Sequence, residues 1–425
     1  MVWCAIFCNF ARRYSMSMNN YQTHTLSNGL RVIHLPRVGS VSYCGFIVNA
    51  GTRDELADEY GLAHLVEHTI FKGTLHRKAY HIRNRMEVVG GELNAYTSKE
   101  ETVIYSIFPS THQERAMELL GDLVANASFP DNEFEKEREV VVEEIEMYRD
   151  TPSELIYDEF ENRLFANHAL GHNILGTPAE LEAITPEKAR NFLSRHYTPR
   201  QMVFFSLSSM PAERVMHLAD RYFSALVNRP ETVARVLPAE LPTFEERISC
   251  DTHQAHVVWG RRTYDLYDKC RLPMLLLNNI LGGPCLNSQL NVALREQRGY
   301  VYTVESSITN YTDTGVFSLY FGTDVRYVDK CMQRVRKVLD RLRNGYLTPA
   351  RLAAAKKQYL GQLMVAEDNN EGLALAIGKG YLRHGSILSP EEQTRRIEAI
   401  SLDMMQQVAQ EMLDADKWSL LVFQP

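Results

Sequence analysis

The chain has 425 residues, of which 45% are hydrophobic, and its formal net charge is −7. This length predicts two or three domains, and the apolar content is normal for a globular protein. The negative charge, and the lack of a basic cluster interleaved with aromatic residues, argue against nucleic acid as a partner.

The first residues contain no acid and include Arg12 and Arg13, a composition that weakly suggests a mitochondrial presequence. An over-extended start is the preferred interpretation, with translation beginning at Met16 or Met18. The seven cysteines are scattered without a C-x-x-C pair, which favours a reducing compartment over a disulfide framework. We therefore expect a cytoplasmic protein, with the mitochondrial matrix and the periplasm less favoured. No apolar run reaches transmembrane length, so no membrane partner is expected.

The most informative segment is His64-Leu65-Val66-Glu67-His68, in which two imidazoles lie four residues apart with a carboxylate before the second. On a helix these positions share one face, so both rings can reach one metal ion. Zinc accepts imidazole nitrogen and carboxylate oxygen, and a catalytic zinc site keeps one position for water. The order H-x-x-E-H is the inverted form of a common zinc-binding helix. An amphipathic helix with two surface histidines is the alternative. Flanking apolar residues, and Gly73 as an expected helix-ending glycine, favour the site.

The strand expected next is Thr102–Phe108, which alternates in polarity and follows the stretch Gly90–Ser98. An exposed edge strand can pair with the backbone of an extended peptide. A Gly-rich turn that leads into a core strand is the structural alternative.

A long helix is predicted from Pro130 to Tyr148, because its apolar residues follow helical spacing. Glu137 and Glu144 lie two turns apart on a face distinct from the apolar stripe. Glu144 is thus a candidate third metal ligand, unless these acids form only a solvated face. His168 and His172 are also four apart, but they lie in a loop-like region and no second metal site is expected there.

A Pro-containing stretch, 229–246, is predicted to be a linker between domains 19–228 and 247–425. The segments Phe129–Phe134 and Leu347–Leu352 resemble each other and each opens a long helix, which indicates two diverged copies.

In this alignment Ala355 lies opposite Glu137 and Gln362 opposite Glu144, and no H-x-x-E-H precedes them. The second half is therefore expected to be non-catalytic. Each half is expected to be α+β, with an antiparallel sheet and helices packed on one side.

These motifs together resemble the zinc peptidases of the pitrilysin and mitochondrial-processing-peptidase group, peptidase family M16. In that family H-x-x-E-H is followed after about 75 residues by a glutamate in an E-E-I context, which Glu143-Glu144-Ile145 matches. The resemblance extends from about Tyr21 to Phe423. It implies the zinc ligands His64, His68 and Glu144, one zinc ion per chain, Glu67 as the general base and Glu137 as a supporting acid.

The resemblance also implies residues that bind substrate. Asn94 and Ala95 match the family's G-x-x-N-A-x-T signature, on a strand beside the metal. Leu294–Tyr302 resembles the segment L-R-E-x-R-G-x-x-Y, in which Arg295 and Tyr302 would reach the substrate. Tyr300 departs from that pattern, which leaves open which tyrosine points toward the substrate.

For the whole chain, the resemblance implies two related α+β domains that close like a clamshell around an extended peptide or unfolded polypeptide. A homodimer is expected, with a heterodimer with an inactive homologue as a second possibility. Two other functions remain open. One is a catalytically silent partner subunit of a processing peptidase, and the other is a peptide-binding module with a structural zinc ion.

Overall fold

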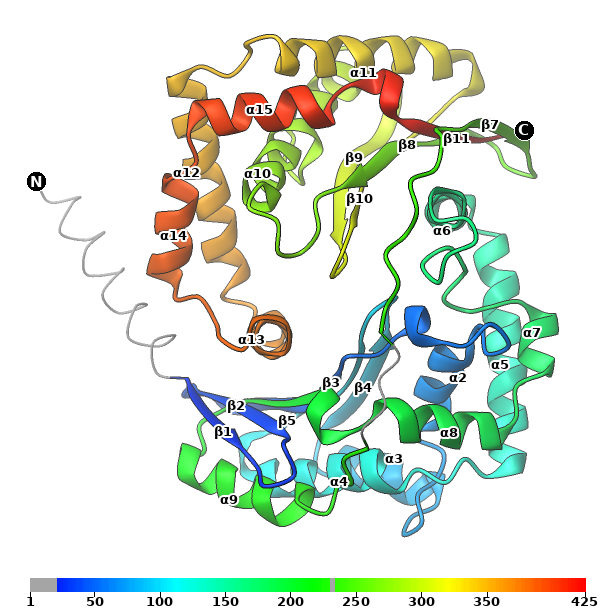
Figure 1. Cartoon of the computed structure of the whole chain (residues 1–425), viewed down its shortest axis with the longest axis vertical. Coiled ribbons are helices and arrows are strands. Elements are labelled where there is room, and N and C mark those ends of the chain that lie inside the picture. Colours follow the sequence, from blue (N-terminus) through cyan, green and yellow to red (C-terminus); the bar gives the residue numbers. More distant parts are fainter. Residues whose placement is uncertain (1–20, 230–233) are drawn as a thin grey trace, which may run out of the picture. The chain divides into compact units, whose positions relative to one another are not determined.

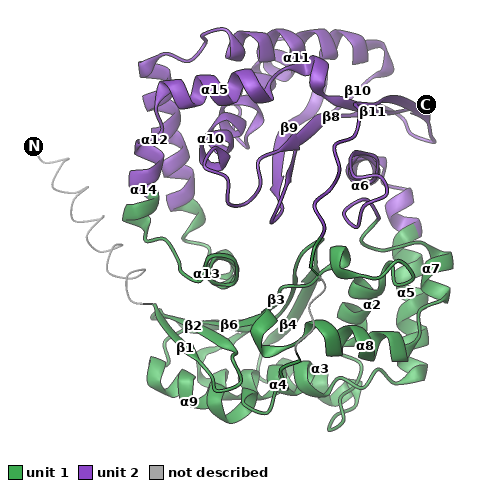
Figure 2. Cartoon of the chain, viewed as in Figure 1, with its two compact units in different colours: residues 1–145, 173–235, 365–393 green, residues 146–172, 236–364, 394–425 purple. Residues whose placement is uncertain are grey.

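The computed structural model describes residues 21–229 and 234–425. The expected translation start at Met16 or Met18, and residues 230–233 of the expected linker, lie outside these residues. The chain divides into two compact units, each assembled from separate segments (Figure 2). The first unit comprises residues 1–145, 173–235 and 365–393, and the second comprises residues 146–172, 236–364 and 394–425.

The first unit contains a six-stranded sheet in the order β1-β2-β6-β3-β5-β4. All neighbouring strands are antiparallel except β2 and β6, which are parallel. The sheet is therefore mixed, whereas the sequence predicted an antiparallel one. Its strands are β1 (Gln22–Thr25), β2 (Arg31–Pro36), β3 (Val41–Val48), β4 (Glu92–Thr97), β5 (Thr102–Pro109) and β6 (Met202–Ser208).

Helices cover both faces of this sheet (Figure 1), whereas the sequence predicted helices on one side only. On one face, Phe46 of β3 packs edge-on against Phe223 at a centroid distance of 4.9 Å. On the other face, Ile377 and its neighbours join the buried core formed by Ile47 and Phe205. The helices of the unit are α2 (Leu62–Thr69), α3 (Ala79–Glu87), α4 (Gln113–Asn126), α5 (Asp131–Arg149), α7 (Pro178–Glu182), α8 (Pro186–His196), α9 (Ala212–Phe223) and α13 (Asn370–His384), with short helices η1 (Thr52–Asp54), η2 (Ser110–His112) and η3 (Pro199–Gln201).

The second unit contains a five-stranded sheet in the order β7-β11-β8-β10-β9, with one parallel pair, β7 and β11. Its strands are β7 (Glu245–Ser249), β8 (Ala255–Thr263), β9 (Val301–Asn310), β10 (Gly315–Thr323) and β11 (Ser419–Gln424). Its helices are α6 (Pro152–Leu164), α10 (Arg271–Gly282), α11 (Val328–Arg343), α12 (Pro349–Ala366), α14 (Pro390–Glu398) and α15 (Leu402–Met412), with short segments η4 (Asn291–Glu296), η5 (Val325–Tyr327) and η6 (Ala415–Lys417). The last residues of α12 and the first residues of α14 belong to the first unit.

The two units exchange one helix each. Helix α6 precedes the linker in sequence but shares a core with Val258 and Leu421 of the second sheet. Helix α13 follows the linker but shares a core with the first sheet. The compact units therefore do not coincide with the contiguous domains 19–228 and 247–425 expected from the sequence. The cause is long-range packing, because each sheet buries its second face under a helix from the other half of the chain.

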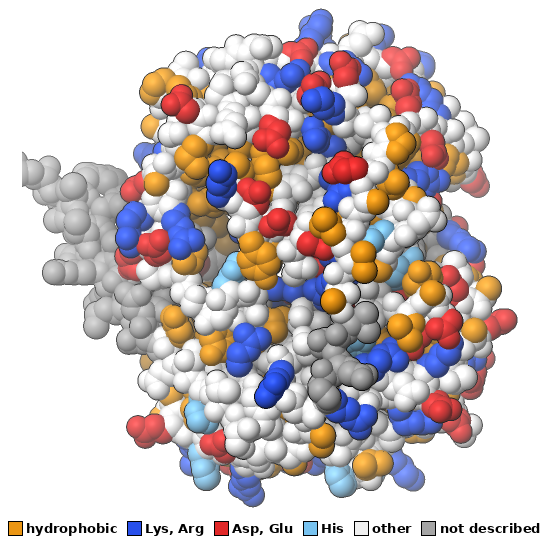
Figure 3. All heavy atoms as spheres, viewed as in Figure 1, with side chains coloured by type: hydrophobic (Ala, Val, Ile, Leu, Met, Phe, Trp, Pro, Cys, Tyr) orange, Lys and Arg blue, Asp and Glu red, His pale blue; other side chains and the backbone are white. Residues whose placement is uncertain are grey.

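Acidic and basic side chains are intermingled on the face of the molecule shown in Figure 3, and neither sign gathers into one large patch. Across residues 21–229 and 234–425, no helix combines the length and the apolar character needed to cross a membrane.

Candidate metal centre

The H-x-x-E-H motif lies on a helix, α2, as predicted. The helix begins after Gly61, whose φ of 88° lies in the region that favours glycine. The buried carboxylate of Glu55 accepts hydrogen bonds from the backbone N–H groups of Gly61 (3.2 Å) and Ala63 (2.7 Å), which otherwise lack partners at a helix start. The helix ends at Thr69, not at Gly73 as expected. Gly73 instead forms an isolated β-bridge with Lys78.

Helix α5 supplies the acidic side chains. It spans Asp131–Arg149 and buries Phe134, Val141 and Ile145, which follow the helical spacing that predicted it. Glu137 and Glu144 lie on another face, and both carboxylates reach the histidines of α2. The expected shared face is therefore confirmed.

Three side chains converge at one point. His64, His68 and Glu144 each offer a ligand atom, and these atoms lie within 4.8 Å of one another. Glu144 Oε2 is 3.8 Å from His64 Nε2 and 3.6 Å from His68 Nε2. Among residues 21–229 and 234–425 this is the one group of His, Cys, Asp and Glu side chains so arranged.

The donor set fits a zinc ion. Burial, and then the charge of His68, lower the pKa of His64 to about 3, so its imidazole is neutral at neutral pH. A neutral ring nitrogen carries the lone pair that metals bind. Two imidazoles and one carboxylate are a common set of protein ligands for a catalytic zinc ion, which keeps its fourth position open.

Outside these three residues, Glu137 supports His68. Glu137 Oε2 lies 3.4 Å from His68 Nδ1, and Glu137 Oε1 lies 2.7 Å from Lys72 Nζ. A carboxylate on the second ring nitrogen fixes the tautomer and orientation of a ligating histidine. Glu137 is thus placed to hold His68 with Nε2 directed toward Glu144.

Glu67 lies on α2 between the two histidines, and its carboxylate is held by β4. Thr97 Oγ1 donates a hydrogen bond of 2.9 Å to Glu67 Oε2. Burial raises the pKa of Glu67, while the hydrogen bond from Thr97 and the nearby His68 lower it, and Glu144 raises it further. A carboxyl group whose pKa is raised above its ordinary value is better suited to accept and return a proton.

The strand next to this site is β4, which carries Asn94 and Ala95, and it is an edge strand. The strand predicted at Thr102–Phe108 forms as β5 (Thr102–Pro109). Strand β5 is internal, between β3 and β4. Asn94 and Ala95 lie on β4, opposite Tyr105 and Ile104 of β5. The backbone edge of β4 that faces away from β5 pairs with no described strand. Alternation within one segment left open whether an edge strand or a core strand forms there, because strand order in a sheet is set by long-range pairing.

Arg295 and Tyr302 lie together in the second unit. The Arg295 guanidinium is 5.6 Å from the centre of the Tyr302 ring, and Tyr302 is 85% exposed. Tyr300 instead stacks on Tyr327 at a centroid distance of 4.8 Å. Tyr302 is therefore the exposed member of the two tyrosines.

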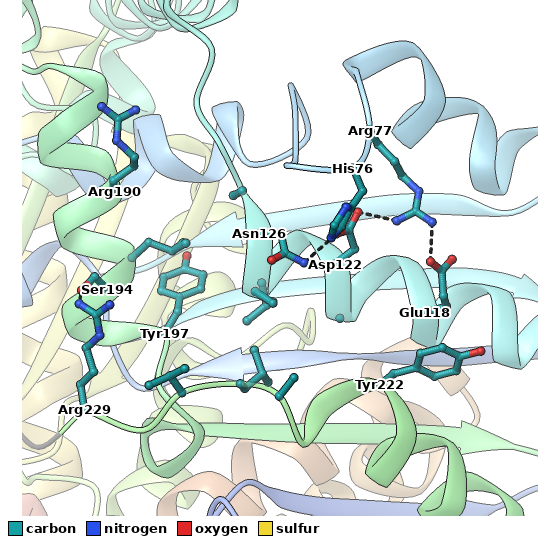
Figure 4. Close-up of a pocket in the computed structure, with 18 residues that line it drawn as sticks. His76, Arg77, Glu118, Asp122, Asn126, Arg190, Ser194, Tyr197, Tyr222 and Arg229 are labelled. Carbon is teal, nitrogen blue, oxygen red and sulfur yellow. Dashed lines mark hydrogen bonds and ion pairs between the residues drawn. The ribbon is translucent and has the colours of Figure 1, made fainter.

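A pocket of about 610 Å³ lies elsewhere in the first unit and contains none of the site residues predicted from the sequence (Figure 4). Its most buried charges are satisfied internally, since Arg77 forms ion pairs with Asp122 and Glu118. The labelled residues that line it are His76, Arg77, Glu118, Asp122, Asn126, Arg190, Ser194, Tyr197, Tyr222 and Arg229.

Sequence reasoning missed two residues of the centre, Thr97 and Lys72. Thr97 belongs to the stretch Gly90–Ser98 that the sequence singled out, but its bond to Glu67 depends on how β4 lies beside α2. Lys72 follows His68 by four residues, and this helical spacing was the available signal for a shared face.

Two family models match the chain. The model described as Insulinase (Peptidase family M16) matches residues 32–178, and the model described as Peptidase M16 inactive domain matches residues 183–359. A Mycobacterium leprae protein named an uncharacterised zinc protease is 32% identical over 400 residues, which are 92% of this chain and 88% of that protein. A Bacillus subtilis protein, also named an uncharacterised zinc protease, is 29% identical over 407 residues, which are 95% and 98% of the two chains.

Solved structures share the fold. A protease from Helicobacter pylori superposes with a TM-score of 0.88 at 21% identity, over 96% of this chain and 100% of its own. A Pseudomonas fluorescens structure described as a peptidase M16 inactive domain has a TM-score of 0.89 at 20% identity, over 96% and 98% of the chains. The expected α+β architecture, with two sheets and packed helices, is confirmed.

Proposed function

The chain belongs to peptidase family M16, and on this premise we propose that it is a zinc-dependent peptidase that hydrolyses extended peptides. The observation that carries the proposal is the convergence of His64, His68 and Glu144 within 4.8 Å, beside the carboxylate of Glu67. The related proteins named as zinc proteases support the same metal.

In this proposal His64, His68 and Glu144 hold the ion. When bound, zinc would polarise the scissile carbonyl and lower the pKa of a water molecule toward neutrality. Glu67 takes a proton from the attacking water and later gives it to the leaving amine. The hydroxyl of Thr97 donates to one oxygen of Glu67 and so fixes the orientation of this carboxylate.

The proposed substrate is an extended peptide, because β4 has a free backbone edge next to this centre. A peptide that pairs with this edge gains main-chain hydrogen bonds and little side-chain selectivity. We assign Asn94 and Ala95 to this edge, and Arg295 and Tyr302 to substrate contacts made by the second unit.

Two measurements test the function. A quenched fluorogenic peptide should be cleaved by the chain, the cleavage should stop with a chelator, and added zinc should restore it. The variant Glu67→Gln should keep one zinc ion per chain and lose at least about 100-fold in kcat, because general acid–base catalysis contributes at least that much. Wild-type turnover in Glu67→Gln with bound zinc would contradict the role of this residue. A wild-type chain with zinc but no turnover would favour the silent-subunit alternative.

A further inference from the structure

The turn between β4 and β5 is unusually charged for a buried segment. It consists of Ser98, Lys99, Glu100 and Glu101, and the three charged residues are only 5%, 5% and 8% exposed. The backbone N–H of Ser98 bonds to the carbonyl of Glu101 at 2.8 Å, which closes the turn. Charged side chains are almost never buried this deeply unless they are paired.

Two arginines from distant parts of the sequence hold Glu100. Arg53, before the metal helix, donates to Glu100 Oε1 at 2.7 Å. Arg235, from the linker, donates to the Glu100 carbonyl at 3.0 Å and pairs with both carboxylate oxygens of Asp54 at 2.9 and 2.8 Å. The turn is thus fixed to the segment that leads into α2.

Helix α13, which packs on the first sheet beside Ile47 and Phe205, also holds the turn. Lys379 forms an ion pair with Glu101, and its ammonium lies 5.0 Å from the centre of the Tyr96 ring on β4. Arg383, one helical turn later, donates to the Glu100 carbonyl at 3.2 Å and lies 3.5 Å from Glu101 Oε2. Both cations come from the half of the sequence that lacks the H-x-x-E-H motif.

The Ser98–Glu101 turn directly follows Thr97, whose hydroxyl holds the proposed base, Glu67, through a hydrogen bond. On the other side of the turn, Thr102 pairs with Thr97 across the β4–β5 ladder and donates to the Ala50 carbonyl at 2.9 Å. A displacement of the turn therefore moves Thr97, and through Thr97 the carboxylate of Glu67.

We propose that Lys379 and Arg383 are positioning residues for Glu67: they fix the Ser98–Glu101 turn and so hold Thr97 in hydrogen-bonding reach of that carboxylate. This inference rests on the proposed function, because it assigns Glu67 the role of base. It means that two side chains of α13, from the second half of the sequence, complete the catalytic half of the chain without contacting the metal ligands.

Variants of α13 and its partners separate positioning from support of the fold. Lys379→Met removes the ion pair with Glu101, and Lys379→Arg restores a cation there. Lys379→Met combined with Glu101→Gln removes both charges, so that no unpaired carboxylate stays buried. The matched control is Arg31→Met. Arg31 donates to the carbonyl groups of Tyr381 at 3.2 Å and Leu382 at 3.4 Å, so it anchors the same helix to β2 without a hydrogen bond to the turn.

We expect kcat to fall about tenfold in Lys379→Met and in the double variant, since small misplacements of a catalytic group have effects of this order or larger. KM should stay within about twofold, and zinc content should not change. Lys379→Arg should recover most of kcat, and Arg31→Met should keep it. An unchanged kcat in the two Lys379 variants, or an equal loss in Arg31→Met, would show that the network serves the fold alone.

A second readout does not depend on activity. Amide hydrogen exchange, followed by mass spectrometry, should be faster in residues 97–102 of Lys379→Met than in wild type, and unchanged there in Arg31→Met. If the wild-type chain cleaves no peptide, the proposed function fails and this exchange experiment alone decides whether α13 fixes the turn. Unchanged exchange at the turn in Lys379→Met would overturn the inference whether or not the chain is a peptidase.

Discussion

The support of His68 by Glu137 leads to a quantitative prediction for the variant Glu137→Gln. Glu137 is close to both His68 Nδ1, at 3.4 Å, and Lys72 Nζ, at 2.7 Å. Glutamine has nearly the same shape but no charge, so the variant keeps the packing of α5. It loses the charge-assisted interaction that orients the His68 ring.

The expected loss is 10- to 100-fold in zinc affinity, which is the usual effect of removing a carboxylate behind a ligating histidine. This corresponds to about 1.4 to 2.7 kcal/mol. Part of the loss has a second cause, because Lys72 would keep its positive charge close to the metal without the carboxylate that now balances it. Adding Lys72→Met to Glu137→Gln should therefore restore part of the affinity.

The zinc dissociation constant, measured by competition with a chromogenic chelator, checks this prediction. Glu133→Gln is the matched control. Glu133 lies one turn earlier on α5 and pairs with the exposed Lys136 at 2.9 Å. Its replacement should leave zinc affinity unchanged. The reasoning is refuted if Glu137→Gln binds zinc as tightly as wild type, or if Glu133→Gln weakens binding equally.

Two further predictions concern the base and the stability of the first unit. Thr97→Val should lower kcat about 10- to 150-fold with zinc retained, because a hydrogen bond to a charged group contributes about 1.5 to 3 kcal/mol. Thr97→Ser should keep wild-type kcat, and steady-state kinetics of the two variants would show the difference. Burial lowers the pKa of His196 from 6.5 to about 4, so the unfolded chain binds more protons than the folded one within this window. The free energy of unfolding of the metal-free chain should therefore fall by up to about 3 kcal/mol as pH drops from 6.5 to 4. Urea titrations at several pH values should show a smaller fall in the free energy of unfolding for His196→Gln than for wild type. An equal fall in the variant would contradict the assignment of this pH dependence to His196.

The sequence predicts which residues of the metal centre lie together when those residues belong to the same helix. His64, Glu67 and His68 fall within a single turn of α2, and Glu137 and Glu144 fall two turns apart on α5. Helical geometry alone fixes which of these side chains share a face. Pairing the two helices required the resemblance to a family, because no local pattern states that α5 lies against α2.

What the sequence did not reveal depends on contacts between distant segments. The edge position of β4 follows from the order of six strands, one of which, β6 (Met202–Ser208), begins long after the others end at Pro109 in the sequence. Tyr300 and Tyr302 are distinguished by their contacts, since Tyr300 stacks on Tyr327 whereas Tyr302 is exposed beside Arg295. The network around Glu100 and Glu101 joins the β4–β5 turn to residues as distant in the chain as Arg383. Residues of this kind carry no periodic signal.

The exchange of helices shows why the two halves of the chain are not independent. Leu373 and Ile377 of α13 are 6% and 1% exposed, and they share a core with Ile47 and Phe205 of the first sheet. Each such side chain stabilises by about 1.5 to 3 kcal/mol when fully buried, so these two alone contribute about 3 to 6 kcal/mol. That is a large share of the 5 to 15 kcal/mol that typically separates a folded domain from its unfolded chain. Without α13, the first half of the chain would expose this face of the sheet, and the Ser98–Glu101 turn would lose its contacts with Lys379 and Arg383. The second half, which holds no metal-binding group among its described residues, thus still supports the centre through packing.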